Sequence, residues 1–171
     1  MSPQNNLTQS RINESLRIEE DANFSAKSHF NAADIWSDRH FYIGIPATVF
    51  GLLTSAALVK DYPTLAGLCS LLATILTALI TFLKPNERAA QHKSLGEQFL
   101  CLRNDTRVFR TIELLEDHKD VEVSKKLKAL VARRNDLNKG SPSIPYTAFK
   151  KARTGIEQGE ATHQVDQNLL G

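Results

Sequence analysis

Two long apolar segments interrupt a chain that otherwise mixes polar and apolar residues over its 171 positions. Residues 41–59 and 62–83 contain no charged side chain, and only Lys60 and Asp61 separate them. At a rise of about 1.5 Å per residue, a helix over either segment is about 28–33 Å long, enough for a bilayer core of about 30 Å. The pattern therefore predicts a transmembrane helical hairpin over residues 41–83.

The segments on either side of the hairpin carry the helical period of three and four residues. Before the first apolar segment, one face holds mainly small side chains: Ala22, Ala26, His29, Ala33, Trp36 and His40. After the second, a face is apolar in its first half and polar later: Leu95, Phe99, Leu102, Thr106, Phe109 and Glu113. Residues at this spacing share one side of an α-helix. We expect two amphipathic helices that pack antiparallel where they leave the membrane.

The rest of the chain completes an all-α membrane protein. We expect Ser124 to cap a further helix that Gly140 ends, and Pro145 to begin a short one. The predicted fold is a two-transmembrane helical hairpin with a cytoplasmic helical bundle, in an oligomer. Its predicted segments are a flexible N-terminus (1–10), a cytoplasmic helix (11–40), the hairpin (41–83, with spans 41–59 and 62–83), cytoplasmic helices (84–154) and a disordered tail (155–171).

Composition alone hides this organisation. The chain has 21 Lys and Arg against 19 Asp and Glu, a net charge of +2 that says nothing about nucleic acid. All but two of these charges lie outside residues 41–83, so a membrane-like part and a water-like part are combined. This pattern excludes a disordered chain and a plain soluble globule. A hairpin buried inside a soluble protein is disfavoured because the remaining residues are too few to enclose it.

Basic residues near the apolar segments predict the topology. Arg39 precedes the first segment, Lys84, Arg88 and Lys93 follow the second, and the connection between them offers Lys60. Because lysine and arginine favour the cytoplasmic side, both termini are predicted to be cytoplasmic.

One face of the second apolar segment carries only small and hydroxylated side chains. They recur at spacings of three and four residues, and we call them the hydroxyl strip: Gly67, Ser70, Thr74, Thr77 and Thr81. The opposite face is large and apolar: Leu68, Leu72, Ile75, Leu79 and Phe82. Such a strip either lines a water-filled path or allows another helix to approach closely. Two helices cannot enclose a channel, so a pore requires several copies of the chain.

The first apolar segment offers a small-residue face and, with Pro85, a candidate hinge. Ala47, Gly51 and Ser55 are spaced by four residues, which is typical of close helix contact with the second segment or with a neighbouring subunit. Pro46 and Pro85 both lie near the predicted cytoplasmic boundary. Each removes a backbone N–H, so the two either act as hinges or set a fixed exit angle.

Little in the sequence points to catalysis. Neither apolar segment contains an interior charged residue or histidine, which argues against a selective transporter or a pump. Cysteines and histidines do not occur at zinc-site spacings, and no glycine-rich phosphate loop is present. We predict a protein that is not an enzyme, with no catalytic residue, no metal site and no cofactor.

Histidines and arginines of the cytoplasmic helices are the remaining candidates. A helical hairpin could bring His29 near His92, and we favour structural histidines over metal ligands. Arg103, Arg107 and Arg110 share one face of their helix. This face either receives an anionic ligand, lipid head groups or an acidic partner, or it is an ordinary solvated face.

Taken together, these residues resemble the SLATT family. The first helix carries His29, Ala33, Trp36 and His40, and residues 42–46 then read Tyr-Ile-Gly-Ile-Pro. Residues 81–85 read Thr-Phe-Leu-Lys-Pro, and residues 89–92 read Ala-Ala-Gln-His, followed by Gly96, Phe99 and Leu102. SLATT proteins are bacterial two-transmembrane effectors, named for their association with SMODS nucleotidyltransferases and SLOG sensors. The resemblance covers roughly residues 20–155.

The resemblance implies a membrane effector of a bacterial anti-phage or conflict system that acts by abortive infection. Such an effector oligomerises in the inner membrane and perforates or depolarises it when a nucleotide second messenger or a partner sensor triggers it. The implied partners are the lipid bilayer, further copies of the chain and a separate sensor or nucleotidyltransferase system, and no nucleic acid binding is expected. The alternative is a non-enzymatic membrane anchor or scaffold that recruits a cytoplasmic partner.

Overall fold

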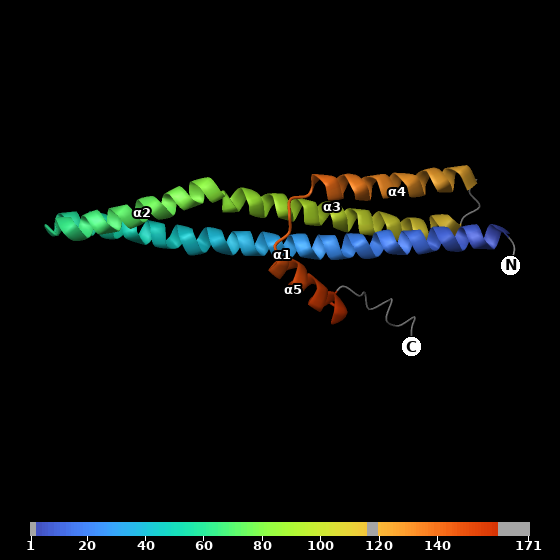
Figure 1. The fold of residues 1–171 in the computed structure, drawn as a ribbon, viewed down its shortest axis with the longest axis horizontal. Coiled ribbons are helices and arrows are strands. Elements are labelled where there is room, and N and C mark those ends of the chain that lie inside the picture. The colour runs from blue at the N-terminus through green and yellow to red at the C-terminus, as the bar shows by residue number, and fades with distance from the viewer. Residues whose placement is uncertain (1–2, 116–119, 161–171) are drawn as a thin grey trace. The chain divides into compact units, whose positions relative to one another are not determined.

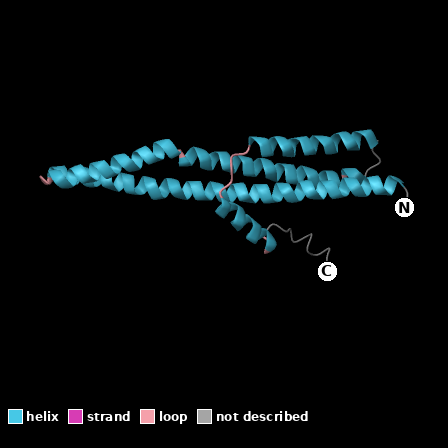
Figure 2. Ribbon diagram, viewed as in Figure 1, coloured by secondary structure: helices cyan, strands magenta, loops and turns pink. Residues whose placement is uncertain are grey.

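The computed structural model describes residues 3–115 and 120–160, and within these ranges it consists of helices joined by short connections (Figure 1). The elements in chain order are α1 (Pro3–Val59), α2 (Pro63–Leu83), α3 (Pro85–Thr111), the short 3-10 helix η1 (Glu113–Leu115), α4 (Asp120–Gly140) and α5 (Tyr146–Glu157). No residue of the described ranges forms a strand (Figure 2), and the predicted all-α class is confirmed.

The chain folds as two compact units, and both α1 and α3 contribute to each of them. One unit, Met1–Ala32 with His92–Gly171, is called the bundle unit below. The other, Ala33–Gln91, is called the hairpin unit. The hairpin unit contains both apolar segments together with residues 33–40 and 84–91 of the flanking helices.

Within the bundle unit, α1 and α3 pack antiparallel. Near the end of α3, Arg110 donates two hydrogen bonds to the carboxylate of Glu19, at 2.6 and 3.1 Å. At the other end of α3 within this unit, His92 contacts His29 of α1. His29 lies ten residues after Glu19 in the sequence. From Arg110 back to His92 on α3, the contacted residue on α1 moves forward from Glu19 to His29. The two helices therefore run antiparallel, as predicted.

Helix α4 lies beside this pair and is held by ion pairs to both helices. Arg11 of α1 donates hydrogen bonds to the carboxylate of Asp120 at 2.8 Å and to the hydroxyl of Ser124 at 3.0 Å. Arg133 pairs with Asp105 of α3 at 2.5 Å. The carboxylate is exposed in each of these ion pairs, and pairs open to water typically contribute below about 1 kcal/mol, so these contacts fix the register of α4 more than they stabilise it.

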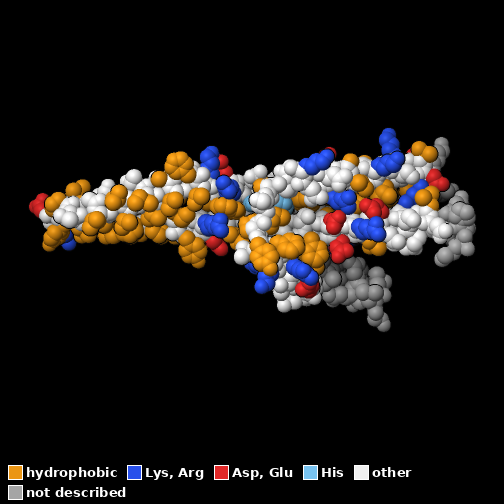
Figure 3. All heavy atoms as spheres, in the orientation of Figure 1, with side chains coloured by type: hydrophobic (Ala, Val, Ile, Leu, Met, Phe, Trp, Pro, Cys, Tyr) orange, Lys and Arg blue, Asp and Glu red, His pale blue; other side chains and the backbone are white. Residues whose placement is uncertain are grey.

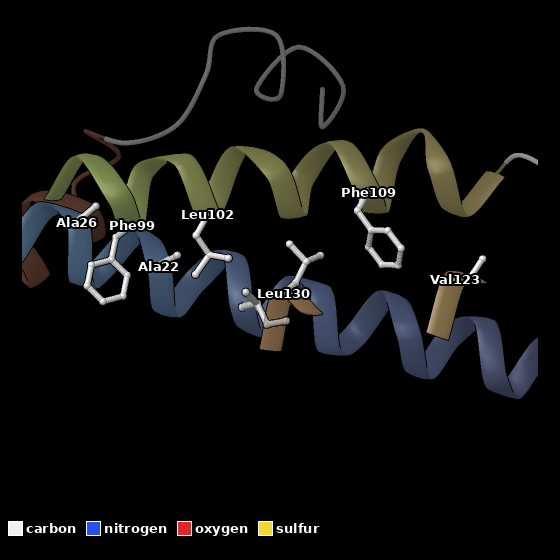
Figure 4. Packing of buried hydrophobic residues seen from close by; sticks show 8 residues of the cluster. Ala22, Ala26, Phe99, Leu102, Phe109, Val123 and Leu130 are labelled. Atoms are coloured by element: carbon white, nitrogen blue, oxygen red, sulfur yellow. The ribbon is translucent and has the colours of Figure 1, made fainter. Parts of the chain in front are cut away.

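Buried apolar side chains supply the main stabilisation of the bundle unit (Figure 4). The core cluster draws on three helices: Ile18, Ala22, Ala26, Phe99, Leu102, Phe109, Val123 and Leu130. In Figure 4, the side chains of Leu102 and Phe109 point from α3 toward α1. Fully burying one such side chain stabilises the fold by about 1.5–3 kcal/mol. The faces predicted from the sequence for α1 and α3 are therefore the faces that form this core.

Small residues set how closely the helices approach. A Cβ atom added to Gly96 of α3 would lie 2.8 Å from a ring carbon of Phe30 on α1. Real Cβ atoms do not come this close to carbon, so the phenyl ring occupies the space that glycine leaves open. Gly96 is thus the point where α3 admits an aromatic side chain of α1.

Helix α5 packs on α1 through its smallest residues. Ala148 and Ala152 are fully buried, and the side-chain amide of Asn31 donates a hydrogen bond to the carbonyl of Ala148 at 3.2 Å. Lys27 of α1 forms an ion pair with Glu160, just beyond the helix. The larger side chain of Phe149 remains exposed, so α5 is amphipathic with an alanine face inward.

The hairpin unit is built from the end of α1, from α2 and from the first residues of α3. Asp61 adopts a left-handed backbone with φ of 54°, and the N–H of Tyr62 donates to the carbonyl of Ala57 at 2.9 Å. This closes a tight turn at Lys60 and Asp61, where the sequence predicts one. Ala57, Ala66 and Cys69 are buried between the two helices near this turn.

The outer surface of the hairpin unit is apolar. In Figure 3, hydrophobic side chains cover most of the visible face of α2 and of the adjoining part of α1. Only 6% and 11% of the most apolar 18-residue windows of the two helices are buried, whereas a core helix of a soluble protein is mostly buried. The described chain thus contains two helices that are long and apolar enough to span a membrane.

Several predicted boundaries differ from the structure. Helix α1 begins at Pro3, not after residue 10, and Arg11 ties its first turns to α4. Helix α4 begins at Asp120, so Ser124 is not its N-cap but the acceptor of a hydrogen bond from Arg11. Helix α5 continues to Glu157, two residues beyond the start of the predicted tail at 155, and residues 161–171 lie outside the described ranges.

Replacing Gly96 with alanine is expected to destabilise the bundle unit by about 1 kcal/mol. The clash with Phe30 costs about 1–3 kcal/mol, and the better helix propensity of alanine returns up to about 1 kcal/mol. In a chain that already carries Phe30→Ala the same substitution is expected to stabilise, because only the propensity effect remains. Thermal unfolding followed by circular dichroism measures both changes. A loss of equal size in the two backgrounds would contradict the assigned contact.

Candidate functional site: the hydroxyl strip

The hydroxyl strip of α2 does not take part in packing between α1 and α2. Ser70, Thr74, Thr77 and Thr81 are all exposed, and a Cβ added to Gly67 would meet no atom within 4 Å. The positions of α2 that α1 covers lie one residue earlier, at Ala66, Cys69, Ala73, Leu76 and Ile80, which are buried or half-buried. Within a single chain the strip therefore faces outward.

Each threonine of the strip is satisfied within its own helix. The hydroxyl of Thr74 donates to the carbonyl of Ser70 at 2.8 Å, that of Thr77 to Ala73 at 2.8 Å and that of Thr81 to Thr77 at 3.0 Å. A hydroxyl that donates to its own helix can enter a membrane without leaving a donor unpaired. Its oxygen keeps a free lone pair that can accept a hydrogen bond from water or from another helix.

The strip lines an open groove of about 550 Å³ along the hairpin unit. Gly51 and Thr54 of α1 form one side, and Ser70, Thr74, Thr77 and Thr81 of α2 form most of the other. Small side chains create the groove, because most of its lining residues are glycine, alanine, serine or threonine and Gly51 has no neighbour within 4 Å of an added Cβ. Its shape suits a second helix or a file of water molecules.

The small-residue face of α1 is not in close contact with α2 in the single chain. Ala47 and Gly51 are half-buried and Ser55 is exposed. The glycine that does approach α2 is Gly44, where an added Cβ would lie 3.7 Å from Ile80. That Ala47, Gly51 and Ser55 make a close contact with the second apolar segment or with a neighbouring subunit stays a prediction.

The two candidate hinge prolines have different local structures. Helix α1 continues through Pro46, whereas α2 ends at Leu83 and Pro85 begins α3. Between them Lys84 takes a left-handed conformation with φ of 46°, and its N–H donates to the carbonyl of Ile80 at 2.9 Å. The chain therefore has a true helix break at Lys84 and an uninterrupted helix at Pro46. Whether either bends during function stays a prediction.

The arginine face of α3 is engaged in contacts within the bundle. Arg110 forms its two-point ion pair with Glu19 of α1, and both side chains are largely covered. Arg103 and Arg107 are half-buried, and Arg103 has an interaction of its own. An anionic ligand at Arg110 would have to displace the carboxylate of Glu19.

His29 and His92 form a buried pair, as the helical hairpin predicts. Their Nδ1 atoms lie 2.8 Å apart, and the ring of His29 stacks on Phe99 with 5.6 Å between ring centroids. One Nδ1 must donate and the other accept, so the contact requires at least one neutral imidazole. Burial, and secondarily the charge of His92, lower the pKa of His29 from 6.5 to about 4.

No group of three or more metal-ligating side chains occurs in residues 3–115 and 120–160. His40 belongs to the hairpin unit, and His118 lies outside the described residues. The pair at His29 and His92 is a contact within the core of the bundle unit.

The contact of two arginines with the ring of Trp36 was not predicted from the sequence. The guanidinium groups of Arg39 and Arg88 lie over its ring, at 4.5 and 4.8 Å from the centroid. The sequence does mark both arginines, because they are among the basic residues that flank the apolar segments. Only the antiparallel packing of α1 on the start of α3 brings them to the same ring.

Lowering the pH is expected to weaken the bundle unit between about pH 6.5 and 4. Unfolded His29 titrates near pH 6.5 and folded His29 near pH 4, so in this window the unfolded chain binds more protons. The stability that neutral His29 provides is complete above pH 6.5 and is lost as the pH falls. Thermal unfolding at a series of pH values measures the effect, and His29→Gln should flatten the dependence. An unchanged slope in that variant would assign the dependence to other groups.

No family model, curated protein or solved structure matches this chain. The resemblance to the SLATT family stays a prediction from the residues that carry it.

Proposed function

We propose that the chain is a membrane effector that assembles from several copies and makes the membrane leaky when it is triggered. In this proposal α2 and the apolar part of α1 cross the bilayer, and the bundle unit lies in the cytoplasm with both termini. The protein performs no catalysis. Its action is to change the permeability of a bacterial inner membrane, as in abortive infection.

The observation that carries the proposal is the outward-facing hydroxyl strip. A helix that only anchors a protein in lipid gains nothing from placing Ser70, Thr74, Thr77 and Thr81 on a single exposed face. A helix that faces copies of itself across a narrow path gains lone pairs that water can use. The aliphatic side chains on the other face then contact lipid.

Assembly is supported by features that the single chain leaves unused. No residue of the described ranges fills the groove of about 550 Å³ along the strip or the open surface at Gly51. Small residues of this kind allow transmembrane helices to approach closely. Neighbouring hairpins would fill the groove in the closed state and separate along it in the open state.

The trigger is proposed to act on the bundle unit. Helices α1 and α3 belong to both units, so a shift of one helix against the other in the bundle reaches the hairpin through continuous backbone. The break at Lys84 and the missing N–H at Pro46 are the positions where the backbone resists bending least. By its resemblance to the SLATT family, the trigger is a nucleotide second messenger or a partner sensor.

A membrane anchor or scaffold is the second candidate, and one observation favours it. Every threonine of the strip already donates its hydrogen bond within α2, so the helix is compatible with lipid on all sides. On this hypothesis the bundle unit recruits a cytoplasmic partner and the membrane stays intact.

Replacing Thr74 and Thr77 with leucine is expected to abolish the leak without preventing membrane insertion. Leucine fills the groove and removes both oxygen acceptors, while the segment becomes more apolar. The measurement is membrane potential, reported by a voltage-sensitive dye in bacterial cells that express the chain alone or with its genomic neighbours. The double variant should return the potential to that of cells without the protein.

Two control variants separate the strip from general effects on the helices. Thr74→Ser with Thr77→Ser keeps both hydroxyls and should keep the leak. Thr48→Leu removes an exposed threonine of α1 that is bonded to the carbonyl of Gly44 in the same way, and it should also keep the leak. A leak that survives in the double leucine variant would refute the role of the strip. An intact potential with the unaltered protein in the membrane, under all conditions, would favour the anchor.

A further inference from the structure

The chain has a single tryptophan, and two arginines converge on it. Trp36 is buried, while Arg39 on α1 and Arg88 on α3 extend over its ring from exposed positions. All three belong to the hairpin unit. Both distances are measured to the same ring centroid, so the two guanidinium carbons lie at most about 9.3 Å apart, within reach of one phosphate-containing head group.

No carboxylate within the described ranges neutralises this pair. Neither Arg39 nor Arg88 forms an ion pair there, although the bundle unit pairs Arg11, Arg110, Arg133 and Arg134 with acidic partners. The nearest acidic residue in sequence to Arg88 is Glu87, and it pairs with Lys84 at 3.1 Å. Two like charges fixed over one aromatic ring, without a counterion from the protein, form a site for an anion.

The position of the pair along the chain indicates which anion it meets. Arg39 lies two residues before the first apolar segment and Arg88 lies five residues after the second. The adjoining aromatic side chains are among the most exposed of the hairpin unit, with Tyr42 at 79% and Phe82 at 83%. Exposed aromatic rings beside basic residues are typical of the level where lipid head groups lie.

From these contacts we infer that Arg39 and Arg88, held by Trp36, bind the phosphate of an anionic phospholipid head group. The two guanidinium groups donate hydrogen bonds to the phosphate oxygens, and the acyl chains lie along the apolar surface of the hairpin unit. Trp36 holds both arginines in place before the lipid arrives, which reduces the loss of side-chain entropy on binding. This inference rests on the membrane insertion proposed above but not on the leak.

A head group fits this site better than a soluble phosphate compound. The apolar segments begin two residues after Arg39 and end five residues before Arg88, so an apolar surface that suits acyl chains starts close to the pair along the chain. The site also offers two charges only, and these are close to the apolar surface. A lipid contributes the additional burial of its chains, whereas free phosphate contributes only the ionic contact.

The single tryptophan supplies the test, because its fluorescence reports on the site alone. The full-length protein in a non-ionic detergent is titrated with short-chain phosphatidylglycerol, with phosphatidylcholine of the same chain length and with inorganic phosphate. A saturable change in emission is expected with phosphatidylglycerol only. A response of equal affinity to phosphatidylcholine or to inorganic phosphate would overturn the assignment.

Charge-removing variants identify the arginines. Arg39→Gln with Arg88→Gln should weaken phosphatidylglycerol binding by at least about tenfold, since each basic residue near a membrane surface contributes about 1 kcal/mol. Lys150→Gln with Lys151→Gln removes the same charge from exposed positions of α5 and should leave the affinity unchanged. Arg39→Lys with Arg88→Lys keeps the charge and should retain part of the affinity, while circular dichroism checks that each variant remains helical. An equal loss in the two glutamine variants would show a general charge effect and contradict the site.

The lipid site and the leak can fail independently. If phosphatidylglycerol binds as expected while the membrane potential stays intact, the lipid site stands and the effector proposal falls. If cells depolarise while the emission of Trp36 does not respond to phosphatidylglycerol, the effector proposal stands and the lipid site falls.

Discussion

Backbone and side-chain donors that enter hydrocarbon must be satisfied from within the chain, and most threonines of the hairpin unit meet this constraint. Its helices pair their own backbone groups, and a tight turn at Asp61 joins them. The hydroxyls of Thr48, Thr54, Thr74, Thr77 and Thr81 all donate to their own helix. The polar groups of the apolar helices are therefore the ones that a bilayer can accept.

The bundle unit is held together by contacts among three long helices. Phe99, Leu102 and Phe109 supply the buried area, and alanines of α1 and the glycine at 96 give them space. Ion pairs such as that of Arg110 with Glu19 then fix the register. Helices α1 and α3 continue from the bundle unit into the hairpin unit, and we propose that a change in this register is passed to the apolar helices through them.

Periodicity in the sequence predicted most of the fold. The apolar segments, the tight turn and the faces of α1 and α3 follow from the spacing of apolar and polar residues, because an apolar residue favours a buried position wherever its helix offers one. Boundaries that depend on a distant partner could not be predicted in this way. Arg11, in the N-terminal part of α1, donates hydrogen bonds to Asp120 and Ser124 of α4. Ser124 accepts this hydrogen bond instead of capping a helix. The pairing of Arg39 with Arg88 over Trp36 likewise depends on two helices meeting.

The central claim is that the hydroxyl strip of α2 faces water in the assembled, leaking protein while the opposite face meets lipid. Single cysteines placed along α2, in a chain with Cys69 and Cys101 replaced by alanine, test it through their reaction with a charged, water-soluble thiol reagent in depolarised cells. The account predicts fast reaction at positions 70, 74, 77 and 81 and slow reaction at 68, 72, 75 and 79. Equal reactivity on the two faces, or an unreactive strip, would contradict it.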